Sequence, residues 1–363
     1  MKIAMLGTRG VPASYSGFET CVEAVGRRLV ERGHEVLVYC RSGHMKPLRS
    51  GYLGMKLENF PSIRTKGLDT LSHSAISTTH AILRAKIDVA LWFGVGNAIY
   101  CRVFKWAGIP TAINVDGADW ARQKWGVFGR HYLHASERLA AKHAGALIAD
   151  SRTISDYYSR RYAARSDFIP YGAEVPDAVG TEALARLGLT SRQYFLAVGR
   201  MVPENGFHDL IAAYAESGSS MPFVVVGDAP YSETYKRSLR EMAPPGTVFT
   251  GYQFGAAYHE LSAHAYAFLF GASVGGTHPV LVEQLAHGNC VLARWTESNA
   301  EVIEDGGLLF HDPGQLKSLF CRLIREPTMV QTMRVRAVSR ARNYSWDSVT
   351  DAYEAVLTNL VKR

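Results

Sequence analysis

The sequence lacks long apolar runs and closely spaced cysteines. Across its 363 residues, no apolar stretch approaches the ~18 residues that a membrane-spanning helix needs. The five cysteines are scattered and none forms a C-x-x-C pair, so the sequence indicates neither a disulfide framework nor a zinc site. The start, MKIAMLGTRG, is too short and too quickly rich in glycine for a signal peptide. We therefore expect a cytoplasmic protein with buried thiols.

The dinucleotide-binding fingerprint is also missing. That motif requires G-x-G-x-x-G after the first strand and an acidic residue about twenty positions further on. Here the first predicted turn has Gly7 and Gly10 in a G-x-x-G spacing, and the second predicted strand ends in Cys40-Arg41. NAD binding is therefore weakly supported, whereas the position of Arg41 leaves NADP open.

Positive charge is in excess, with a formal net charge of +7 at pH 7. Such an excess attracts nucleotide phosphates, anionic lipid or nucleic acid. Basic residues gather at 41–49, 159–165 and 334–342, but no aromatic-interleaved nucleic-acid module accompanies them, so we expect no nucleic-acid partner. Each cluster is best interpreted as a solvated helix face or loop, with peripheral contact to an anionic membrane as the functional alternative.

Short apolar runs alternate with helical patterns, which predicts an α/β protein built from βαβ units with parallel sheets. In the first half we expect strands at 2–6, 35–40, 89–92, 111–115, 147–149 and 168–169, and a helix from about Phe18 that ends before Gly33. In the second half we expect strands at 195–198, 223–226, 248–250, 267–270, 291–293 and 308–310, and a helix that ends at His287. Two such halves predict two facing Rossmann-like domains.

The predicted domain boundaries follow from these patterns. We place the first domain at 1–170, the second at 171–343, and a C-terminal helix at 344–363 that could pack back on the first domain. The weakly patterned segment 171–193 is the predicted linker. Because ligands of such folds bind beyond the carboxyl ends of parallel strands, we expect the ligand in a deep cleft between the two domains.

Two glycine turns carry the first candidate site residues. In GTRGVPASYSGFET, residues 7–20, Gly10 and Gly17 allow close approach of a ligand, and the following helix offers N–H groups to a phosphate. A tight turn without a ligand is the alternative. In FLAVGRMVPENGF, residues 195–207, Arg200 follows a strand and a glycine, so its guanidinium should meet a diphosphate in the cleft. An ordinary ion pair with Glu204 is the alternative.

The most specific motif is SVGGTHPVLVEQLAHG, residues 273–288. Gly276, Thr277 and His278 lead into a helix whose N-terminus is a second candidate anion site. Glu283 lies one turn into this helix among apolar residues, where a carboxylate is costly unless it is hydrogen-bonded. Ribose hydroxyls are the favoured partners of Glu283, with a neighbouring arginine as the alternative. His278 could donate to a phosphate or cap the turn.

These motifs, together with NVDGADWARQKW at 114–125 and NYSWD at 343–347, resemble a family-4 retaining glycosyltransferase of the GT-B fold over nearly the whole chain. More narrowly, the chain resembles the bacterial subgroup that includes rhamnosyltransferases of polysaccharide assembly. The resemblance implies that Glu283 binds the nucleotide ribose, Arg200 the diphosphate, and the loop around Gly17 the phosphate or donor sugar. It also implies that the backbone near Gly251 and Tyr252 faces the base.

Two departures from the family pattern concern the donor. The wider family has two glutamates eight positions apart, but position 275 is Gly275 here, so a carboxylate for the donor sugar is missing. It also usually has a lysine five residues after the arginine, where this chain has Asn205. Both features resemble the rhamnosyltransferase subgroup and indicate an altered donor, such as a deoxysugar.

Asp116 and Asp119 follow the predicted strand at 111–115, on the side that the resemblance assigns to the acceptor. Their spacing is not the D-x-D of metal-dependent transferases, and no His/Asp/Glu cluster indicates a tight metal site. We expect Asp116 to orient the acceptor hydroxyl as a catalytic residue. Capping of the helix that follows is the alternative for both aspartates.

The expected reaction is transfer of a sugar from a nucleoside diphosphate sugar to a hydroxyl acceptor, with retention and without a cofactor or an obligatory metal. The acceptor could be a saccharide, a lipid-linked saccharide or a small molecule, in polysaccharide or glycoconjugate biosynthesis. Arg200 and the two helix N-termini would stabilise the departing diphosphate. A nucleotide-sugar epimerase, a phosphorylase of similar fold and a non-catalytic sugar-nucleotide-binding protein are the alternatives.

Overall fold

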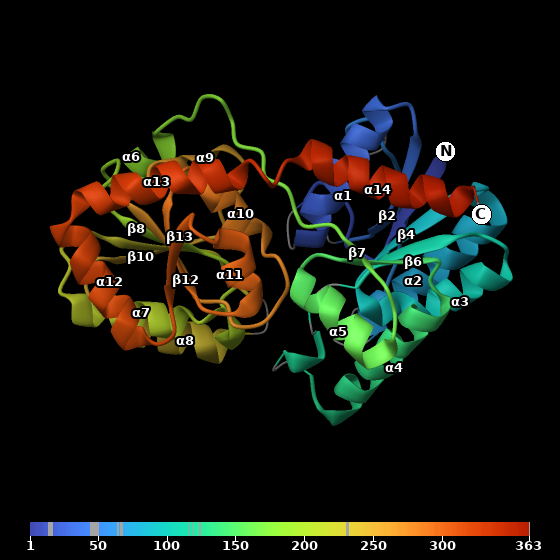
Figure 1. Ribbon diagram of the computed structural model, residues 1–363, viewed down its shortest axis with the longest axis horizontal. Helices are drawn as coiled ribbons and strands as arrows, with labels where there is room; N and C mark the ends of the chain where they lie inside the picture. Colours follow the sequence, from blue (N-terminus) through green and yellow to red (C-terminus); the bar gives the residue numbers. More distant parts are fainter. Residues whose placement is uncertain are drawn as a thin grey trace. The chain divides into compact units, whose positions relative to one another are not determined.

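The computed structural model describes residues 1–13, 17–43, 51–63, 65, 68–115, 117, 119–122, 125–229 and 232–362. The chain forms two units. The first joins Met1–Gly172 with Trp346–Arg363, and the second comprises Ala173–Ser345. In Figure 1 each unit is built around a sheet that carries helices on both of its faces.

The sheet of the first unit is parallel, with strand order β3-β2-β1-β4-β5-β6-β7 in the described residues. Its order reverses between β1 and β4, as in a doubly wound fold. The elements in chain order are β1 (Lys2–Leu6), α1 (Gly17–Glu31), β2 (Glu35–Arg41), β3 (Lys56–Phe60), α2 (Leu68–His80), the π-helical turn η1 (Ala81–Ala85), β4 (Val89–Phe93), the 3-10 turn η2 (Val95–Asn97), α3 (Ala98–Trp106), β5 (Thr111–Asn114), the 3-10 turn η3 (Asp119–Ala121), α4 (Val127–His143), β6 (Ala146–Ala149), α5 (Arg152–Tyr162), β7 (Asp167–Phe168) and α14 (Trp346–Val361).

Helices bury both faces of this sheet, so its central strands are apolar throughout. Successive side chains of a strand point to opposite faces. Ile3 and Met5 of β1 therefore lie in the cluster covered by α1 and α14, whereas Ala4 and Leu6 lie in the cluster covered by α2 to α5. The first cluster is the core on which the C-terminal helix depends.

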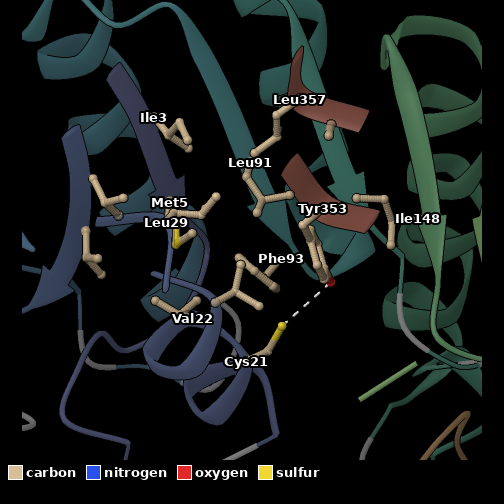
Figure 2. Close-up of a cluster of buried hydrophobic side chains, with 14 of the residues drawn as sticks. Ile3, Met5, Cys21, Val22, Leu29, Leu91, Phe93, Ile148, Tyr353 and Leu357 are labelled. Carbon is tan, nitrogen blue, oxygen red and sulfur yellow. Dashed lines mark hydrogen bonds between the residues drawn. The ribbon is translucent and has the colours of Figure 1, made fainter. Parts of the chain in front are cut away.

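The C-terminal helix α14 belongs to the first unit. Leu357 is fully buried beside Leu91, and Tyr353 lies deep in the same cluster (Figure 2). The Tyr353 hydroxyl accepts hydrogen bonds from Cys21 Sγ at 3.6 Å and from Asn114 Nδ2 at 2.8 Å. Burial raises the pKa of Cys21 to about 12, so this thiol stays neutral and donates.

Ion pairs surround the contact between α1 and α14. Arg28 meets Asp347 at 2.7 Å, and Arg32 meets both Asp351 and Glu354 at 2.7 Å. Exposed pairs of this kind contribute only about 0–1 kcal/mol each. Burial of the apolar side chains of α14 is therefore the larger contribution to its attachment.

The sheet of the second unit is also parallel, with strand order β10-β9-β8-β11-β12-β13 in the described residues. The buried clusters on its faces place α7, α8 and α12 on one side, and α6, α9, α10 and α11 on the other (Figure 1). Its elements are α6 (Glu182–Leu187), β8 (Phe195–Val198), the 3-10 turn η4 (Pro203–Asn205), α7 (Phe207–Ser217), β9 (Phe223–Val226), α8 (Glu233–Met242), β10 (Thr247–Gly251), α9 (Ala256–Ala263), β11 (Ala267–Phe270), α10 (Pro279–Ala286), β12 (Cys290–Arg294), α11 (Glu297–Ile303), β13 (Gly307–Phe310), α12 (Pro313–Arg325) and α13 (Pro327–Ala341).

The predicted strands are confirmed with small shifts at their ends, and two expectations need correction. The strand β3 (Lys56–Phe60) was missed because KLENF is half polar and pairs with β2 at the edge of the sheet. The segment 171–193, predicted as a linker, contains the helix α6, whose Ala183 and Leu184 are buried. In the part of the chain that the structure describes, no helix is long and apolar enough to cross a membrane.

Truncation of Leu357 tests how strongly α14 holds the first unit. We expect Leu357→Ala to lower the free energy of unfolding by about 2–5 kcal/mol, because it leaves a cavity in a closed core. Asn359→Ala, on the exposed side of the same helix, is the matched control and should change it by less than about 0.5 kcal/mol. Urea denaturation measures both. Equal effects of the two substitutions would mean that α14 does not depend on this core.

Candidate functional site

The candidate site of the second unit lies where the strand order reverses. β8 is hydrogen-bonded on one side to β9 and on the other to β11, although β11 comes later in the chain. The loops that leave the carboxyl ends of β8 and β11 are therefore neighbours, which is where doubly wound folds bind ligands. These loops are residues 199–206, which contain Arg200, and residues 271–278, which contain Gly276, Thr277 and His278.

Close contacts between glycines hold these two loops together. A Cβ on Gly206 would collide with the carbonyl oxygen of Gly271, and the φ angle of Gly206 is +66°. A Cβ on Gly227, after β9, would likewise collide with the carbonyl oxygen of Gly199. Only residues without side chains let the backbones meet at this distance. The loops after β8, β9 and β11 thus pack together at the carboxyl ends of these strands.

Hydrogen bonds add to this contact. Ser273 donates to the carbonyl oxygen of Glu204 twice, from its backbone N–H at 2.9 Å and from its hydroxyl at 3.1 Å. Asn205 donates from Nδ2 to the carbonyl oxygen of Arg200 at 2.8 Å. The residue that stands in place of the family's lysine therefore braces the backbone of the loop that carries Arg200, whose side chain is half-buried.

The imidazole of His278 occupies the space above Gly275. A Cβ on Gly275 would lie 2.7 Å from both Cε1 and Nε2 of this ring, and the φ angle of Gly275 is +142°. The ring also packs edge to face on Phe270, with 5.0 Å between the ring centroids. His278 is the N-cap residue of α10, but its side chain makes no capping hydrogen bond to this helix, so the capping alternative is not supported. Thr277 beside it is buried.

Glu283 lies one turn into α10 and is half-buried. The Tyr258 hydroxyl of α9 donates to its Oε2 at 2.5 Å. Burial raises the pKa of Glu283 to about 7, and the hydrogen bond from Tyr258 lowers it. The half-buried carboxylate therefore has a hydrogen-bonding partner, and this partner is a phenol rather than the arginine considered as the alternative. Nothing in the sequence pattern singled out Tyr258.

Gly251 ends the edge strand β10 of the same sheet, and Tyr252 follows it. Gly251 has open space around its Cα atom, and Tyr252 is exposed and stacks on Phe254 with 5.7 Å between the ring centroids. The structure thus offers an open backbone position and an exposed aromatic ring where the resemblance expects the base.

The candidate residues of the first unit are less open. A Cβ on Gly10 would collide with Cys40 Sγ, so tight packing against β2 explains this glycine. Gly17 is the first residue of α1, and Glu19 of that helix accepts a hydrogen bond from Arg9 N at 3.0 Å. The loop before α1 is thereby tied to a carboxylate of the helix itself.

Asp116 lies outside the described residues, so its predicted catalytic role stays a prediction. Asp119 is engaged locally: Arg122 Nε meets its Oδ1 at 2.7 Å, and Trp125 Nε1 donates to its Oδ2 at 3.2 Å. The N-cap of α4 is Gly126, so Asp119 does not cap that helix. These contacts favour a bracing role for Asp119 in its own turn.

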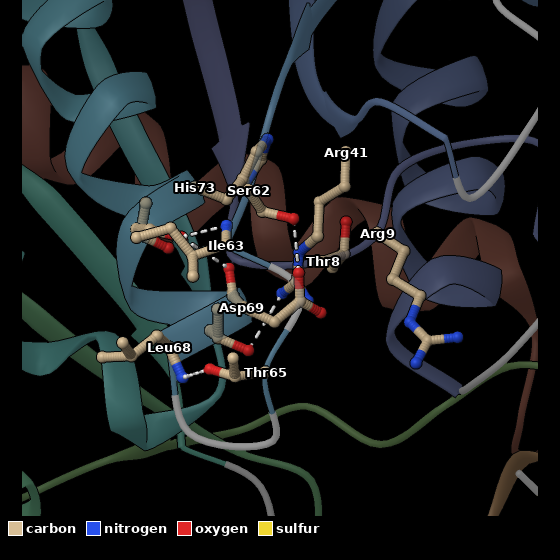
Figure 3. A network of polar contacts seen from close by, with 12 residues as sticks. Thr8, Arg9, Arg41, Ser62, Ile63, Thr65, Leu68, Asp69 and His73 are labelled. Atoms are coloured by element: carbon tan, nitrogen blue, oxygen red, sulfur yellow. Dashed lines mark hydrogen bonds and ion pairs between the residues drawn. The ribbon is translucent and has the colours of Figure 1, made fainter.

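Arg41, which left NADP open, belongs to a buried polar network of the first unit (Figure 3). Its guanidinium donates to Asp69 at 2.9 Å and to Thr70 at 3.2 Å. Burial lowers the pKa of Arg41, and Asp69 raises it. The guanidinium is committed to these side chains, so the NADP interpretation is not supported.

The basic cluster at 334–342 has a structural explanation. Arg334 donates to the carbonyl oxygens of Ala265 and Tyr266, and Arg340 donates to those of Glu301 and Val302. Arg334 and Arg340 thus satisfy backbone carbonyls, whereas Arg336 and Arg342 of the same cluster are exposed. Most of the cluster at 41–49 lies outside the described residues. In the part of the chain that the structure describes, no group of three or more His, Cys, Asp or Glu side chains could hold a metal ion.

Comparison with protein families assigns both halves of the chain. Residues 16–172 match the model described as glycosyl transferase 4-like domain, and residues 192–326 match the model described as glycosyl transferases group 1. The chain thus carries the two domains of a glycosyltransferase of the GT-B type. No curated protein sequence matches it.

Solved structures share the fold over the whole chain. HepE of Anabaena with UDP-glucose is 19% identical, with 99% of this chain and 100% of that chain covered and a TM-score of 0.81. Sucrose-phosphate synthase of Thermosynechococcus elongatus is 17% identical, with coverage of 99% and 98% and a TM-score of 0.81. WaaG, a glycosyltransferase of lipopolysaccharide biosynthesis, is 18% identical, with coverage of 98% for both chains and a TM-score of 0.75. At these identities the likeness shows the fold.

The contact between Gly206 and Gly271 predicts a difference between two alanine substitutions. Gly206 and Gly218 have nearly the same φ, +66° and +63°, but a Cβ on Gly218 would meet nothing within 4 Å. Gly218→Ala should therefore cost only the left-handed conformation, about 1–2 kcal/mol. Gly206→Ala should cost a further ~1–3 kcal/mol for the collision with Gly271. Urea denaturation of both variants checks this, and equal costs would show that the two loops separate freely.

Proposed function

We propose that this chain transfers a sugar from a nucleoside diphosphate sugar to a hydroxyl acceptor, with retention at the anomeric carbon. The observation that carries the proposal is that the loops at the carboxyl ends of β8 and β11 lie side by side. There Arg200 and the N-terminus of α10 leave neighbouring strand ends, and Glu283 follows one turn into that helix. A cation, a helix N-terminus and a carboxylate are the groups that recognise a diphosphate and a ribose.

The names of the similar structures support a nucleotide-sugar donor. HepE of Anabaena was solved with UDP, with UDP-glucose, and with UDP and glucose. WaaG acts in lipopolysaccharide biosynthesis, which supports a saccharide acceptor. On the resemblance of the sequence motifs to the family, we assign the donor to the second unit and the acceptor to the first.

In the proposed donor complex each part of the nucleotide has a partner. Oε1 of Glu283 accepts from the ribose hydroxyls, because Oε2 is already bonded to Tyr258. The N–H groups at the start of α10, together with Arg200, hold the diphosphate. The base lies near the backbone of Gly251 and the ring of Tyr252. Gly10 and Gly17 would lie on the phosphate or sugar side, with Asp116 and Asp119 on the side of the acceptor.

The chemical step separates a diphosphate from the anomeric carbon. The bond between that carbon and the phosphate oxygen breaks, the acceptor oxygen bonds to the same face, and the leaving phosphate takes the acceptor proton. Arg200 and the helix N-terminus stabilise the negative charge that develops on the diphosphate. We propose that these groups suffice without an obligatory metal or a cofactor.

The surroundings of Gly275 bear on the donor sugar. An imidazole lies over the position from which a glutamate would reach the sugar hydroxyls, so a carboxylate cannot be placed there without moving His278. A deoxysugar needs fewer hydroxyl acceptors, and we propose a deoxyhexose donor such as dTDP-rhamnose. A role in polysaccharide assembly, a cytoplasmic location and peripheral contact with an anionic membrane stay predictions of the sequence.

Ligand-dependent melting tests the donor site. A nucleoside diphosphate at about 100 times its Kd should stabilise the protein by about 2.7 kcal/mol, which raises the Tm by several degrees. We expect Glu283→Ala and Arg200→Ala to abolish most of this rise, and Arg237→Ala, an exposed arginine of α8, to keep it. The screen uses UDP, dTDP, GDP and their sugars. If none of them raises the Tm of the wild type, the donor site is wrong.

Turnover separates the transferase from its rivals. Arg200→Ala should reduce the rate of transfer by about 10²–10³, because it removes one donor to the leaving group. An epimerase would convert the donor without an acceptor, whereas a sugar-nucleotide-binding protein would bind it without turnover. Product analysis by mass spectrometry, with and without an acceptor panel, distinguishes these outcomes.

The close contact between Gly275 and His278 predicts that a second substitution restores part of what a first one loses. Gly275→Glu alone should lower the Tm and weaken donor binding, because its Cβ meets the ring of His278. Adding His278→Ala removes that collision, so the double variant should recover part of both and should favour a fully hydroxylated donor sugar. His278→Ala alone is the control for loss of the ring. Equal donor preference in the wild type and the double variant would remove this explanation of specificity.

A further inference from the structure

A network of hydrogen-bonded polar side chains adjoins Glu283 and links α9 to α10. Gln284 donates from Nε2 to the Tyr258 hydroxyl at 3.3 Å and to Ser262 Oγ at 2.8 Å. Its Oε1 accepts from Asn289 Nδ2 at 2.6 Å, and Asn289 also donates to the carbonyl oxygen of Ser262 at 2.8 Å. Gln284, Asn289 and Ser262 are all fully buried. Such an arrangement leaves the amide of Gln284 a single orientation.

This orientation fixes the direction of the hydrogen bond to Glu283. An amide nitrogen only donates, so the Tyr258 oxygen must accept from Gln284. The phenol proton is then directed to Oε2 of Glu283. Burial raises the pKa of Tyr258 well above its ordinary value, so the phenol keeps its proton at neutral pH. Among the described residues, Oε1 of Glu283 has no hydrogen-bond partner.

We infer that Tyr258 is a positioning residue for nucleotide binding: its hydroxyl holds Oε2 of Glu283, so that the carboxylate stays ionised and presents Oε1 to the ribose of the donor. This inference rests on the proposed function, because it assigns a task to the carboxylate of that site. Tyr258 itself touches no substrate. It acts through Glu283, and the hydrogen-bonded side chains of Gln284 and Asn289 act through Tyr258.

The protonation of Glu283 follows from two opposing effects. Burial raises its pKa to about 7, and the bond from Tyr258 lowers it. His259 on α9, His287 after α10 and Arg334 on α13 are basic residues of these packed elements, and none of them is a cause of this shift. Burial lowers the pKa of both histidines, that of His287 to about 4, so neither adds a full positive charge beside Glu283 at neutral pH.

The sign of the effect on binding follows. An ionised carboxylate accepts both ribose hydroxyls, whereas a protonated one has lost part of this capacity. Nucleotide affinity of the wild type should therefore fall as the pH decreases through about 7. Removing the Tyr258 hydroxyl raises the pKa of Glu283 further, so the same fall should occur at a higher pH.

The test is the pH profile of the Kd for UDP or dTDP, whichever binds the wild type, between pH 5.5 and 9. We expect the midpoint of Tyr258→Phe to move up by about one pH unit, which is about fivefold weaker binding at pH 7 and about tenfold weaker binding well below it. Its affinity should approach that of the wild type at high pH. Glu283→Gln should bind weakly and should keep only the midpoint that belongs to the second ionisation of the nucleotide's own terminal phosphate, at about pH 6. Isothermal titration calorimetry gives the affinities.

Tyr266→Phe is the matched control, because it removes another half-buried phenol of the same unit, one that donates to the carbonyl oxygen of Leu323 at 2.7 Å. It should leave the midpoint unchanged even if it lowers the Tm. Gln284→Met, which removes the donor to Tyr258, should shift the midpoint in the same direction by less, and it stands in if Tyr258→Phe does not fold.

Two outcomes separate the inference from the function on which it rests. If Tyr258→Phe keeps the wild-type profile while Glu283→Gln loses affinity, Tyr258 does not position the carboxylate and the donor site stands. If the wild type binds no nucleoside diphosphate at any pH, the proposed function itself fails.

Discussion

The backbone of Gly206 lies against the carbonyl group of Gly271, and the geometry of the candidate site depends on this contact. It brings the loop that carries Arg200 to the loop that leads into α10. Were either position to carry a side chain, the loops would have to separate and Ser273 would lose the carbonyl oxygen of Glu204. A cation after one strand and a helix N-terminus after another can serve one anion only because their backbones meet.

The second constraint is a carboxylate inside an apolar helix. Glu283 would be costly in such surroundings without a donor, and Tyr258 supplies one. The phenol in turn needs the amide of Gln284, which is satisfied by Ser262 and Asn289. These side chains thus form a network of hydrogen bonds that runs from Asn289 to Oε2 of Glu283, while Oε1 of Glu283 and the buried Oδ1 of Asn289 accept no hydrogen bond within it. A site that binds a ligand requires such an unsatisfied group, because a fully paired carboxylate would have nothing to offer.

In the first unit the last helix of the chain completes a core that the first strand begins. Tyr353 of α14 connects Cys21 on α1 with Asn114 at the end of β5, three elements that are far apart in sequence. The unit therefore cannot be complete until the second unit has been traversed by the chain. At the end of β2 in the same sheet, the guanidinium of Arg41 is held by Asp69 and Thr70 instead of a ligand.

The sequence alone determined the class of fold, and the resemblance of its motifs to a known family indicated a glycosyltransferase. Alternating apolar strands and amphipathic helices have a periodicity that survives without tertiary information, and the spacing of Arg200, the glycines and Glu283 reflects local turn and helix geometry. The polar edge strand β3 and the short helix α6 were missed, since KLENF and the segment before β8 have weak periodicity. Tyr258, the ring of His278 over Gly275, and the commitment of Arg41 and Asp119 to their neighbours were decided only by the tertiary structure. Each depends on which side chain of another element, or of a folded turn, comes within hydrogen-bonding or van der Waals distance, and sequence spacing does not encode that distance.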